Sequence, residues 1–140
     1  MKRLTMKEEI NKFCKDIYKD NKKKGFWKDR ENIPYRLDYE ITDNTGYSEF
    51  GEDEIIAVQK AFNAQMLALI HSEISEALEA DRKNLMDDKL PHRKGLEVEL
   101  ADAVIRMFDM AGGLDLDLGG AIVEKLEFNR KRPFKHGKSY

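Results

Sequence analysis

Apolar residues near the start of the chain recur with the period of an α-helix, and the spacing i, i+3, i+4, i+7, i+8 is filled by Ile10, Phe13, Cys14, Ile17 and Tyr18. Thr5 and Glu8 have the spacing of a capping box at a helix start. Gly25 is the residue type that ends helices in the left-handed conformation. The pattern therefore predicts a helix that begins at Thr5 and stops at Gly25.

Three more helices follow from the same kind of pattern. The second is expected from about Glu54 to Arg82, followed by a polar connection over 84–94. The third follows Gly95 and ends at Gly112 and Gly113, and the fourth is capped by Asp115 or Asp117 and continues to about Arg130. Residues 31–53 lack this periodicity and are expected to be an irregular insertion or loop, with a short strand or hairpin possible over 36–42.

Length and composition set the class of protein. A chain of 140 residues with 41% hydrophobic and 37% charged residues suits a single domain, 1–140, with an all-α, four-helix-bundle-like fold. A net charge of −2 gives no overall attraction to nucleic acid, and no apolar run is long enough to span a membrane. A single cysteine and a polar start without a signal segment predict a cytoplasmic protein.

Two acidic doublets are the candidate chemistry: Glu73 with Glu76, and Glu99 with Asp102. Residues three apart share a helix face, so antiparallel packing of the second and third helices would bring four carboxylates together. Ile55, Val58, Phe62, Met66 and Leu69 lead along one face into Glu73 and Glu76, which favours buried acids. The opposing interpretation is a solvated face, because a second apolar stripe runs beside the glutamates through Leu67, Ile70, Ile74 and Leu78.

A carboxylate set of this kind selects a hard cation. The three histidines lie outside the doublets, so magnesium fits best, with manganese as the alternative. The end of the fourth helix supplies basic and amide groups, among them Lys125, Asn129 and Arg132. These residues form either a solvated basic tail or a clamp for substrate phosphates, whereas a nucleic-acid arm is disfavoured by the scarcity of interleaved aromatic residues. The apolar arc of the third helix is broad enough to predict a homo-oligomer.

The chain resembles the MazG-like, all-α nucleoside triphosphate pyrophosphohydrolases. The resemblance rests on Glu-x-x-Glu at 73–76, Glu-x-x-Asp at 99–102 after a spacer of 22 residues, the basic segment 125–138, and Gly-Phe-Trp at 25–27. It covers about half of the chain. One departure is Ser72, where some members carry an additional acid.

The resemblance implies a role for each matched residue. Glu73, Glu76, Glu99 and Asp102 would hold magnesium and form the catalytic centre, while Lys125, Asn129 and Arg132 would contact the triphosphate. Trp27 would stack on the base or, equally, pack as a core or interface aromatic. The implied reaction converts a nucleoside triphosphate, either a ribonucleotide or a deoxynucleotide, to the monophosphate and pyrophosphate, in nucleotide pool control by a dimer or tetramer. The alternative is a noncatalytic helical interaction module with an acidic face.

Overall fold

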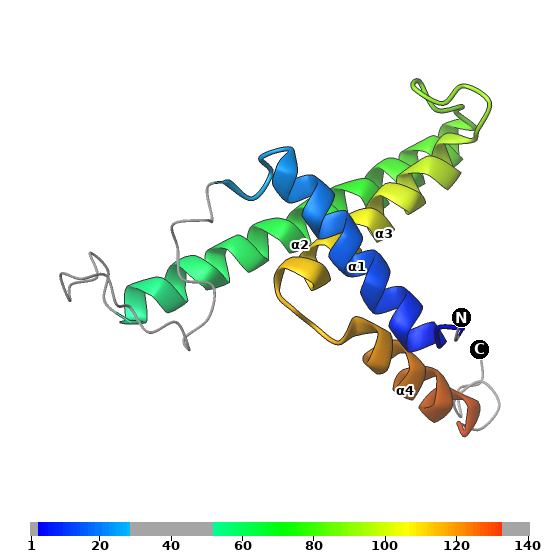
Figure 1. The fold of residues 1–140 in the computed structure, drawn as a ribbon. Coiled ribbons are helices and arrows are strands. Elements are labelled where there is room, and N and C mark those ends of the chain that lie inside the picture. Colours follow the sequence, from blue (N-terminus) through cyan, green and yellow to red (C-terminus); the bar gives the residue numbers. More distant parts are fainter. Residues whose placement is uncertain (1–2, 29–51, 133–140) are drawn as a thin grey trace.

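A computed structural model describes residues 3–28 and 52–132, and the regular structure in these two segments consists of four helices (Figure 1). They are α1 (Met6–Lys23), α2 (Glu52–Lys83), α3 (Gly95–Gly113) and α4 (Leu118–Arg130). The predicted all-α class is confirmed for these residues, and each predicted boundary is met to within about two residues. α2 begins at Glu52, two positions earlier than predicted, so the last two residues of the insertion expected over 31–53 are helical. The rest of that insertion, including the alternative of a strand over 36–42, lies outside the described residues.

The predicted capping groups set the ends of α1 and the start of α4. The Thr5 side chain accepts a hydrogen bond from the Glu8 backbone amide, and the Glu8 carboxylate accepts one from the Thr5 amide. Gly25, with φ of 87°, leaves the helical conformation two residues after α1 ends. Of the two candidate caps for α4, Asp117 is the one used, since its side chain accepts from the Gly120 amide.

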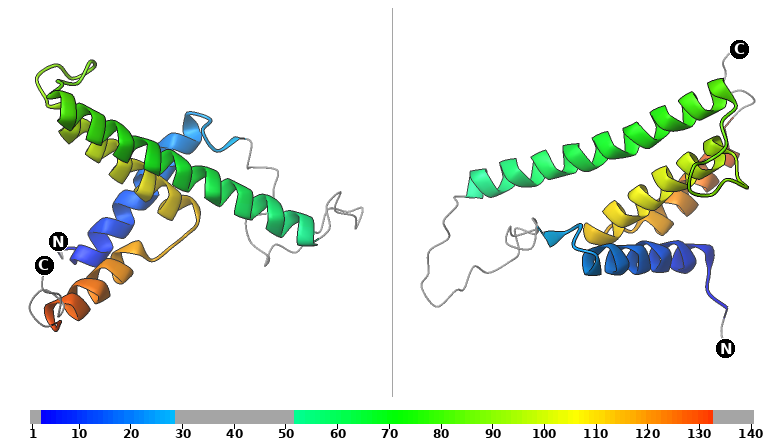
Figure 2. Two further views of the ribbon diagram at one scale, coloured as in Figure 1. Left: turned by 180° about the vertical axis from the view of Figure 1, so that it is seen from behind. Right: turned by 90° about the horizontal axis from the view of Figure 1, so that it is seen from above.

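The helices are stacked in layers. α2 runs antiparallel to α3, α1 packs on α3 and crosses the α2–α3 pair, and α4 lies against α1 (Figures 1 and 2). Seen from above, α3 lies between α2 and α1 (Figure 2). The four helices therefore do not run side by side as in a simple bundle, and α4 diverges from the α2–α3 pair.

α1 and α3 come into close contact at Gly112. A Cβ atom at this position would lie 2.2 Å from the backbone carbonyl oxygen of Cys14 and 2.8 Å from Cβ of Tyr18. Only glycine permits this approach without separating the helices. Gly113 has a similar role, because a Cβ there would lie 2.0 Å from the Trp27 ring.

The start of α4 is attached to α1 by a polar network around Asp117. Its carboxylate accepts hydrogen bonds from Lys7 Nζ at 2.6 Å and from Asn11 Nδ2 at 2.7 Å. Asn11 Oδ1 in turn accepts from the Gly119 amide at 2.8 Å. These donors stabilise the charged carboxylate and lower the pKa of Asp117 to about 2. The direction of α4 is thus set by polar contacts with α1 as well as by packing.

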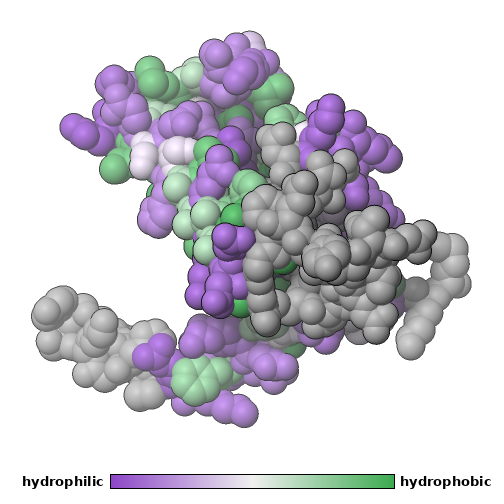
Figure 3. All heavy atoms as spheres, turned by 90° about the vertical axis from the view of Figure 1, so that its left-hand side faces the viewer, coloured by the Kyte–Doolittle hydropathy of each residue, from purple (hydrophilic) through white to green (hydrophobic). Residues whose placement is uncertain are grey.

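The core of the described region is small. Its buried hydrophobic residues include four alanines, whereas many leucine, isoleucine and methionine side chains remain exposed. Figure 3 shows apolar side chains at the surface among hydrophilic ones. None of the described helices combines the length and apolar character that crossing a membrane requires.

Candidate metal centre

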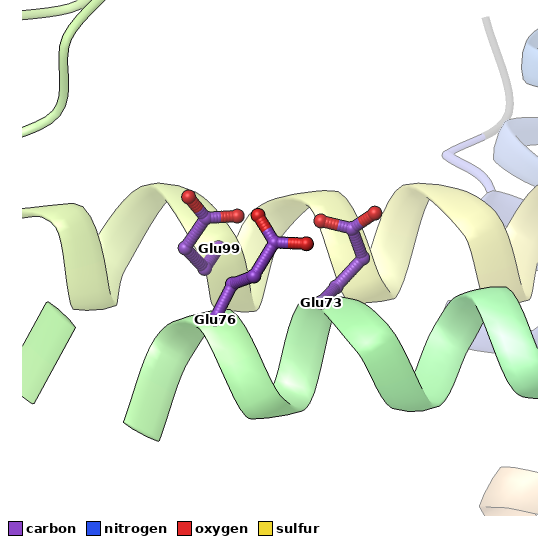
Figure 4. Close-up of side chains that lie close together, drawn as sticks. All are labelled: Glu73, Glu76 and Glu99. Carbon is purple, nitrogen blue, oxygen red and sulfur yellow. The ribbon is translucent and has the colours of Figure 1, made fainter. Parts of the chain in front are cut away.

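Three of the four predicted acids converge where α2 faces α3. Glu73 and Glu76 extend from α2 and Glu99 extends from α3, and their carboxylates gather on one side of the helix pair (Figure 4). One carboxylate oxygen from each residue lies within 4.8 Å of the other two. The i, i+3 spacing aligns the first two residues, and antiparallel packing brings the third to the same level. We call Glu73, Glu76 and Glu99 the carboxylate cluster.

The three carboxylates differ in their exposure to solvent. Glu73 is 6% exposed, Glu99 is intermediate and Glu76 is exposed. Burial of a charged carboxylate is costly without a partner. Glu73 has one, because Arg106 Nε donates a hydrogen bond to its Oε1 at 2.6 Å. This pair anchors the cluster at its buried end and leaves Glu76 and Glu99 toward solvent.

Glu99 lies in a crowded, partly buried environment of other acids. Burial raises the pKa of its carboxyl group, and the charges of Glu76 and Glu73 raise it further. A smaller contribution comes from Asp102. The cluster therefore favours either a proton on Glu99 or a cation among the three carboxylates.

Asp102, the fourth predicted ligand, lies beside the carboxylate cluster and is not one of its members. It is exposed on α3 and lines an adjacent cavity of about 340 Å³. Ser72, which directly precedes Glu73, donates its hydroxyl hydrogen to the Leu69 carbonyl oxygen at 2.8 Å. The structure thus groups three of the four acids and places Asp102 between them and the cavity.

The cavity is lined by five aromatic or aliphatic residues and by four polar or charged ones. Trp27 is buried, and its indole nitrogen donates to Asp109 Oδ1 at 3.0 Å. Its ring also meets the ring of Tyr18 edge-on, with the centroids 4.9 Å apart. Trp27 is consequently a core residue and a wall of the cavity at once. Arg106 joins the two regions, because it contacts Glu73 and also lines the cavity.

The predicted phosphate-binding residues lie elsewhere in this chain. Lys125 and Asn129 belong to the second half of α4, which packs on α1, and Arg132 follows two residues after the end of the helix. Lys125 Nζ lies 4.9 Å from the centre of the Phe128 ring, and the Arg132 guanidinium lies 6.0 Å from it. In Figure 1 the end of α4 lies at the bottom of the molecule, whereas the 84–94 connection of the α2–α3 pair lies at the top. The structure therefore does not bring these basic groups to the carboxylate cluster within one chain.

Two polar residues of the site were not singled out from the sequence. Arg106 neutralises Glu73, and Asp109 positions the Trp27 indole. Both lie on α3, and Arg106 follows Glu99 by seven residues, which places these two on one face of the helix. The shared face could have indicated that Arg106 lies near the acids. It does not indicate which acid of α2 pairs with the arginine.

We compared the chain with family models, curated proteins and solved structures. None of the three comparisons gives a significant match.

Proposed function

We propose that this protein is a magnesium-dependent hydrolase that converts a nucleoside triphosphate to the monophosphate and pyrophosphate. The observation that carries the proposal is the carboxylate cluster, whose three oxygens lie within 4.8 Å of one another. With only one arginine bound to the cluster, its negative charge exceeds the positive charge that the described contacts supply. A divalent cation would offset this excess.

The donor set supports magnesium. All three side chains offer carboxylate oxygens, and His71 and His92 lie outside the cluster. Magnesium prefers such hard oxygen donors and is commonly held by a few carboxylates together with water and substrate phosphates; manganese accepts the same donors. We assign Glu73, Glu76 and Glu99 as ligands, and Asp102 as an acid that completes the site from the cavity side.

The adjacent cavity supports a nucleotide as the substrate. Its volume, about 340 Å³, falls within the range of small-molecule sites. Apolar walls formed by residues such as Met66 and Leu69 suit a base, and Trp27 adds an aromatic residue to the lining. A nucleoside in this cavity would direct its phosphates toward Asp102 and the carboxylate cluster.

The proposed reaction is attack of water on the phosphorus that remains with the nucleoside. A new P–O bond forms, the bond to the next bridging oxygen breaks, and pyrophosphate leaves with that oxygen. A divalent ion held by Glu73, Glu76 and Glu99 would neutralise charge on the phosphates and acidify the attacking water, whose proton would pass to solvent. Arg106 holds Glu73 in place, so the carboxylates keep one arrangement while charge develops on the phosphates.

The direct test is a panel of ribo- and deoxyribonucleoside triphosphates, incubated with the full chain with and without magnesium. We expect metal-dependent appearance of pyrophosphate and monophosphate in equal amounts. Without added pyrophosphatase the proposed reaction releases no inorganic phosphate, whereas stepwise dephosphorylation does. An assay for inorganic phosphate therefore distinguishes the two reactions. A folded protein that is inert toward every nucleotide contradicts the proposal and supports the noncatalytic helical module.

Magnesium is also expected to stabilise the folded chain, and to do so more at about pH 8 than at about pH 5. The pKa of Glu99 is raised in the folded state, so the stability that its proton contributes is lost as the pH rises through that value. A cation removes this repulsion at the higher pH. Thermal unfolding in millimolar magnesium should show a melting temperature about 4 °C higher than with a chelator. An unchanged melting temperature at both pH values would count against a metal centre.

A further inference from the structure

Arg106 is the permanent positive charge of the helix pair that carries the site. Residues 61–81 of α2 and the whole of α3 contain no other lysine or arginine. Among the described residues that line the cavity, Arg106 is likewise the only basic one, and the acids Asp102 and Asp109 lie in the same wall. A phosphorylated ligand in this cavity therefore meets a single cationic side chain.

The guanidinium of Arg106 has donors left for a ligand. Its Nε donates to Glu73 Oε1 at 2.6 Å, which uses one of its five N–H groups. Within residues 3–28 and 52–132, no other hydrogen bond or ion pair engages this side chain, which is 44% exposed. The four N–H groups on the two terminal nitrogens are thus available, while Nε stays on the buried glutamate.

Along α3, Arg106 lies between the two ends of the site. Glu99, a member of the carboxylate cluster, precedes it by seven residues, and Asp109, which accepts the Trp27 indole hydrogen, follows it by three. These intervals correspond to about 10 Å and about 5 Å along the helix axis. A nucleotide with its base at Trp27 and its outer phosphates at the carboxylate cluster would pass Arg106 with the phosphate attached to the nucleoside.

We propose that the terminal N–H groups of Arg106 bind the phosphate attached to the nucleoside, while its Nε holds Glu73. This inference rests on the proposed function, because it takes a nucleotide as the ligand of the cavity. A guanidinium suits both tasks, since its donors form a rigid planar fork, whereas the ammonium group of lysine is a single point charge. The basic end of α4 lies away from the carboxylate cluster and supplies no such contact within the chain (Figure 1).

The test measures the binding of nucleoside monophosphates, which carry this phosphate and contain no anhydride bond to hydrolyse. The common ribo- and deoxyribonucleoside monophosphates are titrated into the full chain with magnesium, and each matching nucleoside serves as the phosphate-free reference. Arg106→Lys is expected to weaken the best monophosphate about tenfold and to change nucleoside binding less than about twofold. A loss confined to the monophosphate cannot come from a distorted cavity, because the nucleoside occupies the same cavity.

A second variant removes the charge but keeps a hydrogen-bond donor for Glu73. Arg106→Gln is expected to weaken monophosphate binding on the order of 100-fold, since its amide is neutral. In Arg106→Lys, the affinity for magnesium without nucleotide should stay within about threefold of wild type, because a positive charge remains beside Glu73. Circular dichroism verifies that both variants are folded.

Arg93→Lys is the matched control. Arg93 pairs with Glu97 at 3.2 Å and is not among the residues that line this cavity. The same change of arginine to lysine is therefore expected to leave monophosphate binding within about twofold of wild type.

The possible outcomes separate this proposal from the proposed function. Monophosphate binding that is unchanged in both Arg106 variants overturns the proposal alone, and the hydrolysis assay then decides the proposed function. Unfolding of both variants, or parallel losses for monophosphate, nucleoside and magnesium, also overturns it, because Arg106 then acts only through the structure. A wild-type chain that binds no monophosphate contradicts the contact even if it hydrolyses triphosphates. A wild-type chain that binds monophosphates but hydrolyses no triphosphate contradicts only the proposed function.

Discussion

Replacement of Glu76 by glutamine is expected to reduce magnesium-dependent pyrophosphate release by on the order of 10²- to 10³-fold. Glu76 is exposed, so glutamine removes a charge from the carboxylate cluster without burying an unsatisfied group. The fold should be retained, while the cation loses one of three charged ligands. The initial rate of pyrophosphate release at saturating nucleotide, together with magnesium titration, measures both effects.

Glu79→Gln provides the matched control for this prediction. Glu79 is an exposed glutamate on the same helix, but its carboxylate pairs with Lys83 and is not part of the carboxylate cluster. We expect this variant to keep the wild-type rate within about twofold, as is usual for an exposed ion pair. Equal losses of activity in Glu76→Gln and Glu79→Gln would argue against metal binding at the carboxylate cluster.

Gly112→Ala is expected to have the largest effect on stability, a loss of about 3 kcal/mol or a fall of about 10 °C in melting temperature. The added methyl group would meet the backbone carbonyl oxygen of Cys14 at 2.2 Å, and a backbone atom cannot move aside as a flexible side chain can. α1 and α3 must therefore separate. Helix propensity alone predicts the opposite sign, a gain of about 1 kcal/mol.

Gly25→Ala separates packing from backbone conformation in the same experiment. Gly25 has φ of 87° and no atom within 4 Å of an added Cβ, so only the conformational cost applies there, about 1–2 kcal/mol. Chemical denaturation gives both free energies of unfolding. If Gly112→Ala proves as stable as the wild-type chain, the close crossing of α1 over α3 is wrong.

The helix boundaries could be predicted because their signals are local. The capping box of Thr5 and Glu8 connects residues three apart, and the Asp117 cap contacts a backbone amide three residues on. The sequence did not decide whether Asp115 or Asp117 caps the fourth helix, since both residues lie within a few positions of its start. The contacts of Asp117 with Lys7 and Asn11 give it a further role in fixing the position of α4 on α1.

The candidate site was predictable in part. The spacing of Glu73 and Glu76 places both on one face, and a short connection to α3 brings Glu99 within reach. The sequence does not determine how α2 and α3 are rotated relative to each other. That rotation groups Glu99, and not Asp102, with the two acids of α2. Nor does the sequence show that Arg106 pairs with Glu73, because the two are 33 residues apart.

The sequence by itself determined where the helices begin and end and which residues share a face, because helical periodicity and capping act over a few residues. Only the tertiary structure decided how these faces meet. Contact between α1 and α3 at Gly112, and between α4 and α1 at Asp117, sets crossing angles and layer order through atoms far apart in the chain. The antiparallel packing of α2 on α3 places three carboxylates together, and the contacts of α4 with α1 direct the basic end of α4 away from them. The physical reason is that packing rotates and tilts whole helices, a freedom that no local pattern constrains.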